Sequence, residues 1–513
     1  MIKKLLSLLL HGTKIFFAIV FFLLIAILLL ATLRGVGGNP TPLIIVSDLR
    51  SETMPFELSP ERGRYALLLS MVENHSFIFT KDIAAIAVPD LGSIGGKYVS
   101  LFAPGVSLIA IPFYLLGKSV GFAQIGAFSV SGFFALFNLL LIALIVKKIS
   151  GNGFAGLTGG LTFLFATAAW PYAGTLYQHH LSAFLLLGAF YILLFPRHIM
   201  RTILFGFAFG ISLFIDYPNG IFFLPLLVFL FSKHLQFGEH ENRINIIFSF
   251  SVFLVIIGII IGLAPSLWYN KEAYGNPFQL AGTLKSVRTL EPSATDLPEQ
   301  VQISYKKKTA LGFFKSEHMA QGFEVLLTSR DRGILFFSPV ILLGLLGCIP
   351  LLRKKSDAGY VILAQVGVFL TLYSLWGDPW GGWAFGPRYL IPMFGFLGVG
   401  LGVAIHEYGK KLVFMLVYFI LLNYSLAISL TGALTTNQIP PGIESSAALY
   451  PAYTFLYNFS LLYSGVSGSY VYNTFFRNIL SLPYFAGGLF LIVSTLITIF
   501  YVQSMQNKRS SYL

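Results

Sequence analysis

Apolar runs recur along the whole 513-residue chain, separated by short polar loops and by three longer polar segments. A run of roughly 18 apolar residues can cross the ~30 Å hydrocarbon core of a bilayer as an α-helix. The pattern predicts about twelve such helices, and therefore an all-α polytopic membrane protein. The expected spans are residues 16–33, 124–146, 153–174, 179–196, 202–217, 219–232, 245–267, 333–352, 358–376, 388–405, 411–430 and 481–502.

The apolar stretch from Leu101 to Leu116 decides the topology. If it crosses the membrane, the basic clusters of the short loops lie opposite the N-terminal pair Lys3-Lys4. If it lies at the interface, all of them share the cytoplasmic side, as the positive-inside rule prefers. Pro104 and Pro112 also suit a short interfacial helix. We therefore expect a juxtamembrane helix, both termini in the cytoplasm, and outer segments at residues 34–123, 268–332 and 431–480.

The outer segments suggest a simple division of the chain. We expect a membrane module over residues 1–430, which includes the first outer segment 34–123 and the second outer loop 268–332. An outer loop and a final span follow over residues 431–513. Because the inner loops are short, a sizeable binding or catalytic surface is expected on the non-cytoplasmic face. No internal repeat is evident, which weakens a transporter fold built from duplicated halves.

Composition supports the membrane class and argues against several others. Hydrophobic residues make up 56% and charged residues 11% of the chain, whereas soluble domains are roughly a quarter charged. The net charge of +13 is explained by basic residues in short inner loops, so we expect no nucleic-acid partner. The single cysteine, Cys348, rules out an intramolecular disulfide. Neither a Walker loop nor a zinc-type HExxH spacing is present.

The first outer segment carries the carboxylates best placed for catalysis. A general base is a positioned carboxylate that takes a proton, and it contributes typically ~10²–10⁴-fold to a rate. Glu61 has Arg62 and Arg64 beside it, and an apolar helical stretch follows at once. The dipole of that helix favours a negative charge near the membrane surface. These residues alone do not separate Glu61 from Asp48 in the same segment.

Two polar sites lie where predicted spans meet the outer face. His179 and His180 open one span, but adjacent positions do not share a helix face, so interfacial hydrogen bonding is favoured over metal binding. No cofactor is required by the sequence, and a divalent metal stays an open alternative. Asp216 ends another span. A carboxylate in or near the membrane is costly, which makes a functional role the default hypothesis.

A loop rich in glycine and tryptophan precedes the span at residue 388. Trp380 and Trp383 suit stacking on a sugar ring, although interfacial tryptophans are normally membrane anchors. Arg388 opens the following helix and suits a phosphate, because a guanidinium donates paired hydrogen bonds. Arg332 is a second candidate for such a phosphate clamp.

Several of these segments resemble those of the GT-C superfamily of integral-membrane glycosyltransferases, in the branch of protein mannosyltransferases and lipid A aminoarabinose transferases. That branch carries a proline–acidic–x–x–Arg–Tyr–Ala-like motif in its first outer loop, and this chain matches it from Pro60 to Ala66. Further similarities follow in order at residues 98–117, 269–277, 327–339 and 380–390.

The resemblance implies transfer of a sugar from a polyprenyl-phosphate donor to a glycan, lipid or protein acceptor on the non-cytoplasmic face, with inversion at the anomeric carbon. It implies Glu61 as the base that takes the acceptor's proton and favours Glu61 over Asp48. We expect the donor phosphate to be held by Arg388 with Arg332 or Arg64. The other residues expected to line the cavity are His179, Asp216, Tyr65, Trp380 and Trp383.

Two positions depart from the family pattern. The acidic residue of the first-loop motif is commonly aspartate, and here it is Glu61, which is one methylene longer. A second carboxylate often opens the fourth span, and His179 stands in the matching place. Both changes keep acid–base or metal chemistry open but alter its geometry.

Two other functions suit the same topology. A multi-pass transporter or flippase of lipid-linked glycans also has many spans and both ends inside, but it would form no glycosidic bond. A glycan polymerase or ligase would keep the chemistry and use a lipid-linked oligosaccharide as donor.

Overall fold

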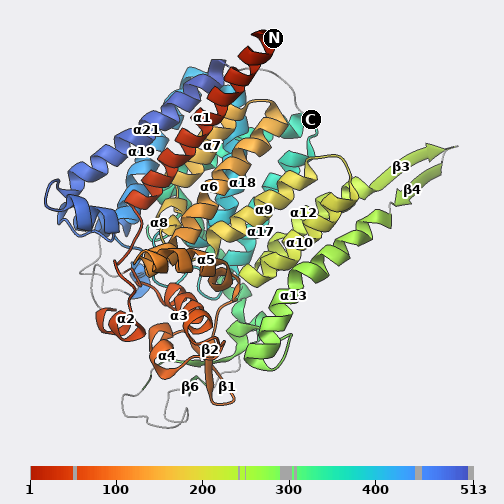
Figure 1. Ribbon diagram of the computed structural model, residues 1–513. Helices are drawn as coiled ribbons and strands as arrows, with labels where there is room; N and C mark the ends of the chain where they lie inside the picture. The colour runs from red at the N-terminus through yellow and green to blue at the C-terminus, as the bar shows by residue number, and fades with distance from the viewer. Residues whose placement is uncertain are drawn as a thin grey trace.

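The computed structural model describes residues 2–49, 55–240, 243–248, 250–288, 290, 303–304, 309–444 and 453–506. Figure 1 shows a bundle of long helices with both chain termini at one end and a smaller layer of mixed structure at the other. We call this smaller part the outer layer. It comprises the described residues of 34–122 and 275–332.

The bundle is built from α1 (Ile2–Ala31), α6 (Ala123–Ser150), α7 (Gly153–Phe165), α8 (Ala169–Ala173), α9 (His179–Leu193), α10 (Ile199–Ile215), α11 (Asn219–Phe222), α12 (Leu224–His234), α13 (Leu254–Tyr274), α15 (Ile334–Phe337), α16 (Gly344–Arg353), α17 (Asp357–Ser374), α18 (Ile391–Tyr408), α19 (Leu412–Leu434) and α21 (Leu482–Gln506). The outer layer holds α2 (Pro42–Asp48), α3 (Ser59–Glu73), α4 (Lys81–Ala87), α5 (Gly105–Ser119) and α14 (Met319–Leu327). Between α19 and α21 lies α20 (Phe455–Tyr463).

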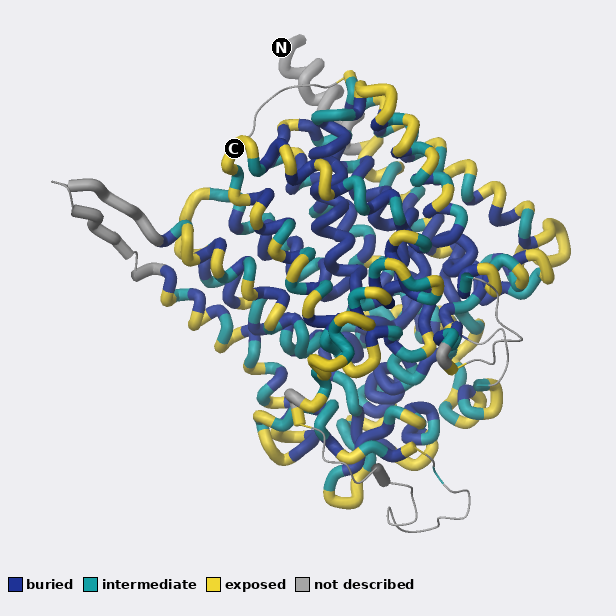
Figure 2. Tube along the Cα trace, turned by 180° about the vertical axis from the view of Figure 1, so that it is seen from behind, coloured by how far each residue is buried: buried dark blue, intermediate teal, exposed yellow. Residues whose placement is uncertain are grey.

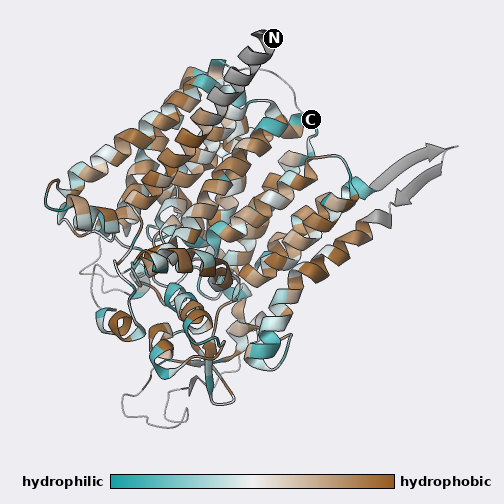
Figure 3. Ribbon diagram, in the orientation of Figure 1, coloured by the Kyte–Doolittle hydropathy of each residue, from teal (hydrophilic) through white to brown (hydrophobic). Residues whose placement is uncertain are grey.

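The predicted helical membrane fold is confirmed at a coarse level. Among the described residues, six helices are long and apolar enough to cross a membrane: α6, α13, α17, α18 with the turn before it, α19 and α21. Shorter apolar helices, such as α7, α9 and α10, fill most of the other predicted spans. Apolar residues dominate the bundle in Figure 3. The number of spans and the side on which the termini lie stay predictions.

Some predicted spans are interrupted in the structure. Such a break is not visible in the apolar pattern when a side chain within the segment makes the hydrogen bonds that the backbone loses there. The span expected at 153–174 is α7 followed by the short α8. Between them the Thr167 hydroxyl donates to Phe163 O at 2.6 Å and accepts from Ala169 N at 3.1 Å. The span expected at 245–267 lies later in the chain, because α13 begins at Leu254.

Glycines allow α10 and α13 to pack at very short range. A Cβ added at Gly206 or at Gly258 would lie 2.1 Å from a backbone oxygen of the partner helix. Gly210 and Gly262 make equivalent contacts one turn further on. Small residues spaced by one turn are typical of close helix pairs in membranes. The pairing fixes the end of α10, directly before Asp216, against the helix that leads into the outer layer.

The outer layer contains a small antiparallel sheet, so the all-α expectation is corrected to a mostly helical fold. Its strands are β1 (Leu91–Ile94), β2 (Lys97–Ser100), β5 (Lys285–Val287) and β6 (Ile303–Ser304), in the order β2-β1-β5-β6. Gly95 and Gly96 form the turn between β1 and β2 with φ of 54° and 77°, as a two-residue hairpin loop requires. Strands this short leave no readable alternation. A second hairpin, β3 (Leu235–His240) with β4 (Arg243–Phe248), follows α12.

The predicted juxtamembrane helix is α5, which lies across the outer end of α6 (Figure 1). The two helices meet at Gly117 and Gly126, where an added Cβ on either would lie 2.9 Å from the other's Cα. The position of α5 at a membrane interface stays a prediction.

The centre of the bundle is α18. In its membrane-length window, which begins at Arg388, 94% of the residues are buried. It packs against α6, α7, α9, α16 and α17, and Figure 2 shows the buried residues gathered along this centre. Arg388, in the turn directly before this helix, therefore lies at the end of the most buried membrane-length segment among the described residues.

Residues after 430 are bonded back to the start of the outer layer. Arg34 forms an ion pair with Glu57 and donates a hydrogen bond to Gly432 O at 2.9 Å. Asn437 N donates to Glu57 Oε2 at 2.8 Å, and Ser469 forms an isolated β-bridge with Arg34. The predicted division of the chain at residue 430 stays a prediction.

Candidate active site

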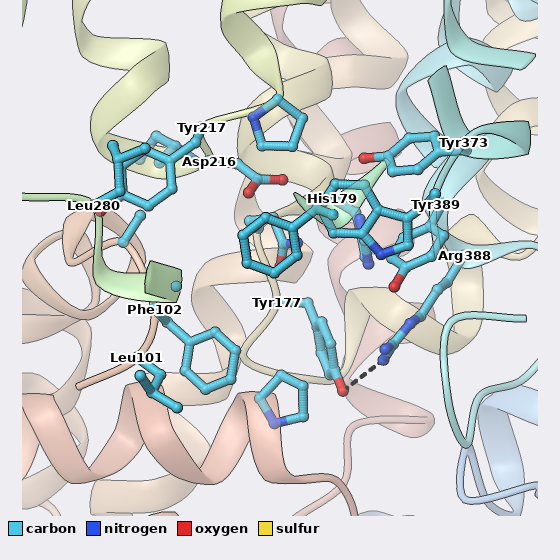
Figure 4. A pocket seen from close by; sticks show the side chains of 18 of the residues that line it. Leu101, Phe102, Tyr177, His179, Asp216, Tyr217, Leu280, Tyr373, Arg388 and Tyr389 are labelled. Atoms are coloured by element: carbon cyan, nitrogen blue, oxygen red, sulfur yellow. Dashed lines mark hydrogen bonds between the residues drawn. The ribbon is translucent and has the colours of Figure 1, made fainter. Parts of the chain in front are cut away.

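A cavity of about 400 Å³ lies between the outer layer and the outer ends of the bundle helices. Several separate segments line it, and Figure 4 shows their side chains around one space. They are Pro60 and Arg64 of α3, residues 101–103 after β2, residues 177–179 at the start of α9, residues 215–218 after α10, residues 280, 282 and 283, residues 313–314, Tyr373 and Trp376 near the end of α17, and Arg388-Tyr389 before α18.

Arg64 is one of two buried guanidinium groups at this cavity. Its Nη1 donates to Pro60 O at 3.0 Å and its Nη2 to Gln178 Oε1 at 2.6 Å. The guanidinium carbon lies 4.8 Å from the ring centre of Phe102, a cation–π distance. Burial lowers the pKa of Arg64 to about 10, so the side chain is still charged at neutral pH.

Arg388 is the second buried guanidinium. Its Nη1 donates to the Tyr177 hydroxyl at 2.9 Å (Figure 4), and its Nη2 donates to Gly381 O at 2.6 Å. The Nε is buried without a hydrogen-bond partner in the described structure. The ring of Tyr177 lies near both cations, with 5.1 Å to Arg388 Cζ and 5.4 Å to Arg64 Cζ.

Asp216 is the only carboxylate among the described residues that line the cavity. It follows the last residue of α10. Gln178 accepts a hydrogen bond from Arg64, and the Asp216 carboxylate is close enough to act on the charge of Arg64. Asp216 and Arg64 are therefore electrostatically coupled across this side of the cavity.

His179 packs flat against Tyr177, with 5.5 Å between ring centres and 8° between ring planes. Its Nε2 is buried and has no hydrogen-bond partner in the described structure. His180 is bonded elsewhere, because its Nε2 lies 2.8 Å from Ala169 O. The two histidines therefore do not act as a pair.

Stacked aromatic rings form one wall of the cavity. Tyr373 and Tyr389 are nearly parallel at 4.6 Å, and Trp376 and Phe313 are nearly parallel at 5.4 Å. Flat apolar surfaces edged by hydroxyl groups suit the face of a sugar ring. The sequence predicts a sugar-stacking surface formed by Trp380 and Trp383, but neither residue lines the cavity.

Glu61 is buried, with 1% of its surface exposed, but it does not line the cavity. Its Oε1 accepts a hydrogen bond from Leu58 N at 2.9 Å, so the side chain caps the start of α3. Its Oε2 has no partner in the described structure. Burial, and then the nearby Glu57, raise the pKa of Glu61 from its usual 4.5 to about 8 against the opposing effects of Leu58 N and Arg34.

The other predicted site residues lie away from the cavity. Asp48 is exposed at the end of α2. Tyr65 is fully buried against Phe56, Tyr114 and Phe128. Trp380 does not line the cavity, and Trp383 is 43% exposed and donates to Glu444.

Arg332 is also outside the cavity and is wholly buried. Its guanidinium donates to the backbone oxygens of Asp331, Trp380, Gly382 and Ile439, at 2.8 to 3.2 Å. These bonds hold the glycine-rich loop before Arg388 in place. The structure therefore brings together Arg64, Arg388, His179 and Asp216 from the predicted set, and it leaves Glu61, Asp48, Tyr65, Arg332, Trp380 and Trp383 outside the cavity.

Sequence reasoning missed several residues of the site. Tyr177 and Gln178 precede the histidine pair, and nothing in their local sequence marks them. Tyr177 contacts both arginines, and Gln178 contacts Arg64. Trp376 and Tyr389 flank the tryptophan-rich loop rather than lying within it. The useful signal was the clustering of polar and aromatic residues at span ends.

Metal ligands do not gather in this site. Among the residues that the structure describes, no group of three His, Cys, Asp or Glu side chains could hold a metal ion. Within the described residues, no cluster of metal-binding side chains supports the alternative of a divalent metal.

No protein-family model matches the sequence, and no curated protein matches it. Two solved structures are similar over 96% of this chain and 78% of theirs, with 12% sequence identity and a TM-score of 0.48. Both are ArnT from Cupriavidus metallidurans, one in the apo state and one bound to undecaprenyl phosphate.

Proposed function

We propose that this protein is an integral-membrane glycosyltransferase. It transfers a sugar from a polyprenyl-phosphate donor to an acceptor at the non-cytoplasmic face, with inversion at the anomeric carbon. The proposal includes about twelve spans and both termini in the cytoplasm. It rests on the charge and shape of the cavity together with the motif from Pro60 to Ala66.

The observation that carries the proposal is the pair of buried arginines. Arg64 and Arg388 face one cavity, and Asp216 is the single carboxylate among its described lining residues. Two buried cations beside one anion leave a positive charge that a bound anion stabilises. A phosphate monoester or diester fits, because guanidinium groups bind phosphate oxygens with paired, charge-assisted hydrogen bonds.

The rest of the cavity suits a lipid-linked sugar. Leu101, Phe102, Ile215, Ile221 and Leu280 supply apolar surface for the first part of a prenyl chain. The stacked rings of Tyr373, Tyr389 and Trp376 supply a surface for the sugar. Because the cavity lies at the outer ends of the bundle helices, the lipid tail can remain among helices while the sugar faces the outer layer.

In the proposed reaction, an acceptor hydroxyl oxygen attacks the anomeric carbon, and the bond from that carbon to the phosphate oxygen breaks. The phosphate leaves with the electron pair, and Arg64 and Arg388 stabilise its added charge. The hydroxyl proton passes to a carboxylate acting as base. No oxidant, reductant or nucleotide is required.

Glu61 is the proposed base. It lies one turn before Arg64 on α3, and its charge acts on both Arg64 and Tyr177. A pKa near the working pH suits a group that takes up and releases a proton. To reach the acceptor, the carboxyl must leave Leu58 N, which costs about 1 kcal/mol for one hydrogen bond. Asp216, already at the cavity wall, is the rival candidate for this role.

The deciding experiment is mass analysis of glycans and glycolipids from cells with and without the protein. We expect one glycan or glycolipid to lose a single sugar when the protein is absent and to regain it on complementation. The purified protein should also form a glycosidic bond when given extracted polyprenyl-phosphate sugars. Movement of a lipid-linked sugar across vesicles, with no bond formed, would replace the proposal with a transporter.

A further inference from the structure

A second cavity of about 400 Å³ lies between α12 and α17, on the flank of the bundle. Apolar side chains such as Val228, Val361 and Val368 line most of it, and Asp357 is its only charged lining residue among those described. Leu224, Val228 and Tyr360 are 50%, 69% and 57% exposed. The cavity is therefore a groove on the outside of the bundle, on a surface that lipid would contact in a membrane.

Basic side chains meet beside this groove. α12 ends and α17 begins towards the end of the bundle that carries both chain termini (Figure 1). There Lys148 Nζ lies 4.9 Å and Arg201 Cζ 5.0 Å from the ring centre of Phe195. Lys233 donates to Leu193 O, and its Nζ lies 4.8 Å from the ring of Phe229, which also lines the groove. We call Lys148, Arg201 and Lys233 the basic cluster.

The charge of the basic cluster is not balanced by its surroundings. Within the described part of the chain, no carboxylate lies within 4.0 Å of these three side chains. Asp357 attracts Lys233 from a longer distance, and Lys148 repels it. One carboxylate against three cations leaves a positive site next to an apolar groove.

This juxtaposition favours one kind of ligand. An anionic headgroup needs cations at the membrane surface, and its acyl chain needs an apolar groove leading away from them. Basic pockets between membrane helices are known to bind phosphate headgroups of lipids. The cation–π contacts hold the three side chains near fixed rings, so less rotamer freedom is lost on binding than for free lysines.

We propose that the groove between α12 and α17 and the basic cluster form one binding site for an anionic phospholipid. The phosphate of the headgroup lies against Lys148, Arg201 and Lys233, and one acyl chain lies along Val228 and Val368. The site is separate from the cavity that holds Arg64 and Arg388, and it does not rest on the proposed glycosyltransferase function.

The test compares lipid binding by the full-length purified protein and two double variants. Native mass spectrometry counts phosphatidylglycerol and phosphatidylcholine molecules retained as each lipid is titrated. We expect the wild type to prefer one phosphatidylglycerol molecule, and Arg201→Gln/Lys233→Gln to bind it at least tenfold more weakly, which is about 1.4 kcal/mol. The control Lys410→Gln/Lys411→Gln removes the same charge from the exposed loop between α18 and α19 and should bind like the wild type.

Two further arms separate a lipid site from a simple anion site. Ala364→Phe fills the groove without changing its charge and should also weaken phosphatidylglycerol binding, whereas Gly488→Phe, at an exposed position of α21 away from the groove, is the size control. Soluble glycerol phosphate should not displace the lipid. Equal losses in both charge variants, unchanged binding in Ala364→Phe, or displacement by glycerol phosphate would each overturn the proposal. Sugar transfer, assayed separately in detergent, reports on the first cavity alone.

Discussion

The two arginines at the cavity differ in how they are held. Arg388 bonds to a tyrosine hydroxyl and to a backbone oxygen at the end of the most buried helix. Arg64 bonds to the side-chain amide of Gln178 and is attracted by the nearby Asp216 carboxylate. We therefore propose that Arg388 binds the phosphate at a fixed position and that Asp216 helps to position Arg64.

Replacing Arg388 tests the phosphate site. Arg388→Ala should raise the KM for the polyprenyl-phosphate donor by about 10- to 100-fold, because charge-assisted hydrogen bonds contribute about 1.5–3 kcal/mol. Arg388→Lys keeps the charge but cannot bond to Tyr177 and Gly381 at once, so it should recover only part of the affinity. Arg477→Ala, an exposed site on the described surface, is the control. A normal donor KM in Arg388→Ala would show that Arg388 does not bind the donor phosphate.

The base is tested by a pair of isosteric changes. Glu61→Gln should lower kcat by about 10²–10⁴-fold, the contribution of a general base, while donor binding is retained. Asp216→Asn removes the charge that acts on Arg64 and should mainly alter donor KM. The reverse ranking of the two kcat values would assign the base to Asp216.

Titration of Glu61 should also appear in stability. Its pKa is about 8 in the folded protein and near 4.5 when unfolded, so between these values the folded chain binds more protons. Stability therefore falls as pH rises through this window. The melting temperature of the wild type should drop from about pH 5 to about pH 9 more than that of Glu61→Gln. Parallel pH profiles would show that Glu61 is not buried as described.

At this scale, sequence reasoning found the charged residues better than their partners. Arg64, Arg388 and Asp216 were marked by charge at the edge of apolar spans, where charge is costly. Arg332 carried the same mark, yet it satisfies backbone oxygens of a loop more than 40 residues away. Local sequence does not distinguish a guanidinium that meets a ligand from one that meets the protein's own backbone.

Among the elements, α10 and α13 position Asp216, the only carboxylate among the described residues that line the cavity. Their glycines permit contact at backbone distance, so the height of Asp216 above the bundle depends on the register of this pair. The spacing Gly206-x-x-x-Gly210 and Gly258-x-x-x-Gly262 is readable in the sequence, but which helices pair is not.

A single methyl group should disturb this pair. Gly206→Ala places a Cβ 2.1 Å from a backbone oxygen of α13, and overpacking of this kind costs about 1–3 kcal/mol. Gly367→Ala in α17, where an added Cβ meets nothing within 4 Å, is the matched control. We expect a lower apparent melting temperature for Gly206→Ala alone. Equal melting of both variants would argue against the close crossing.

Element bounds were harder to predict than element type. The sheet of β1, β2, β5 and β6 joins parts of the chain almost 200 residues apart, and its strands are too short to show a periodic pattern. At the break between α7 and α8, the Thr167 hydroxyl bonds to Phe163 O and Ala169 N. The apolar pattern of the sequence continues through this break and therefore does not reveal it.

For the whole molecule, the basic residues of short loops set the predicted orientation, and chemical labelling tests it. In a Cys348→Ala background, Lys97→Cys replaces an exposed lysine of the outer layer and Lys410→Cys an exposed lysine between α18 and α19. A membrane-impermeant maleimide should label Lys97→Cys in intact cells and Lys410→Cys only after permeabilisation, since positive loops stay inside. The opposite pattern would invert the topology and move the active site to the cytoplasm.

The hydrogen bond from Asn437 N to Glu57 joins segments that are synthesised at very different times. Glu57 and Arg34 are made early, whereas Gly432 and Asn437 leave the ribosome only after most of the chain has been inserted. The surroundings of Glu61 therefore close last, when the end of α19 arrives. A nascent or truncated chain can carry Arg64 and the first part of the cavity, but it lacks the hydrogen bond from Asn437 to Glu57 beside Glu61.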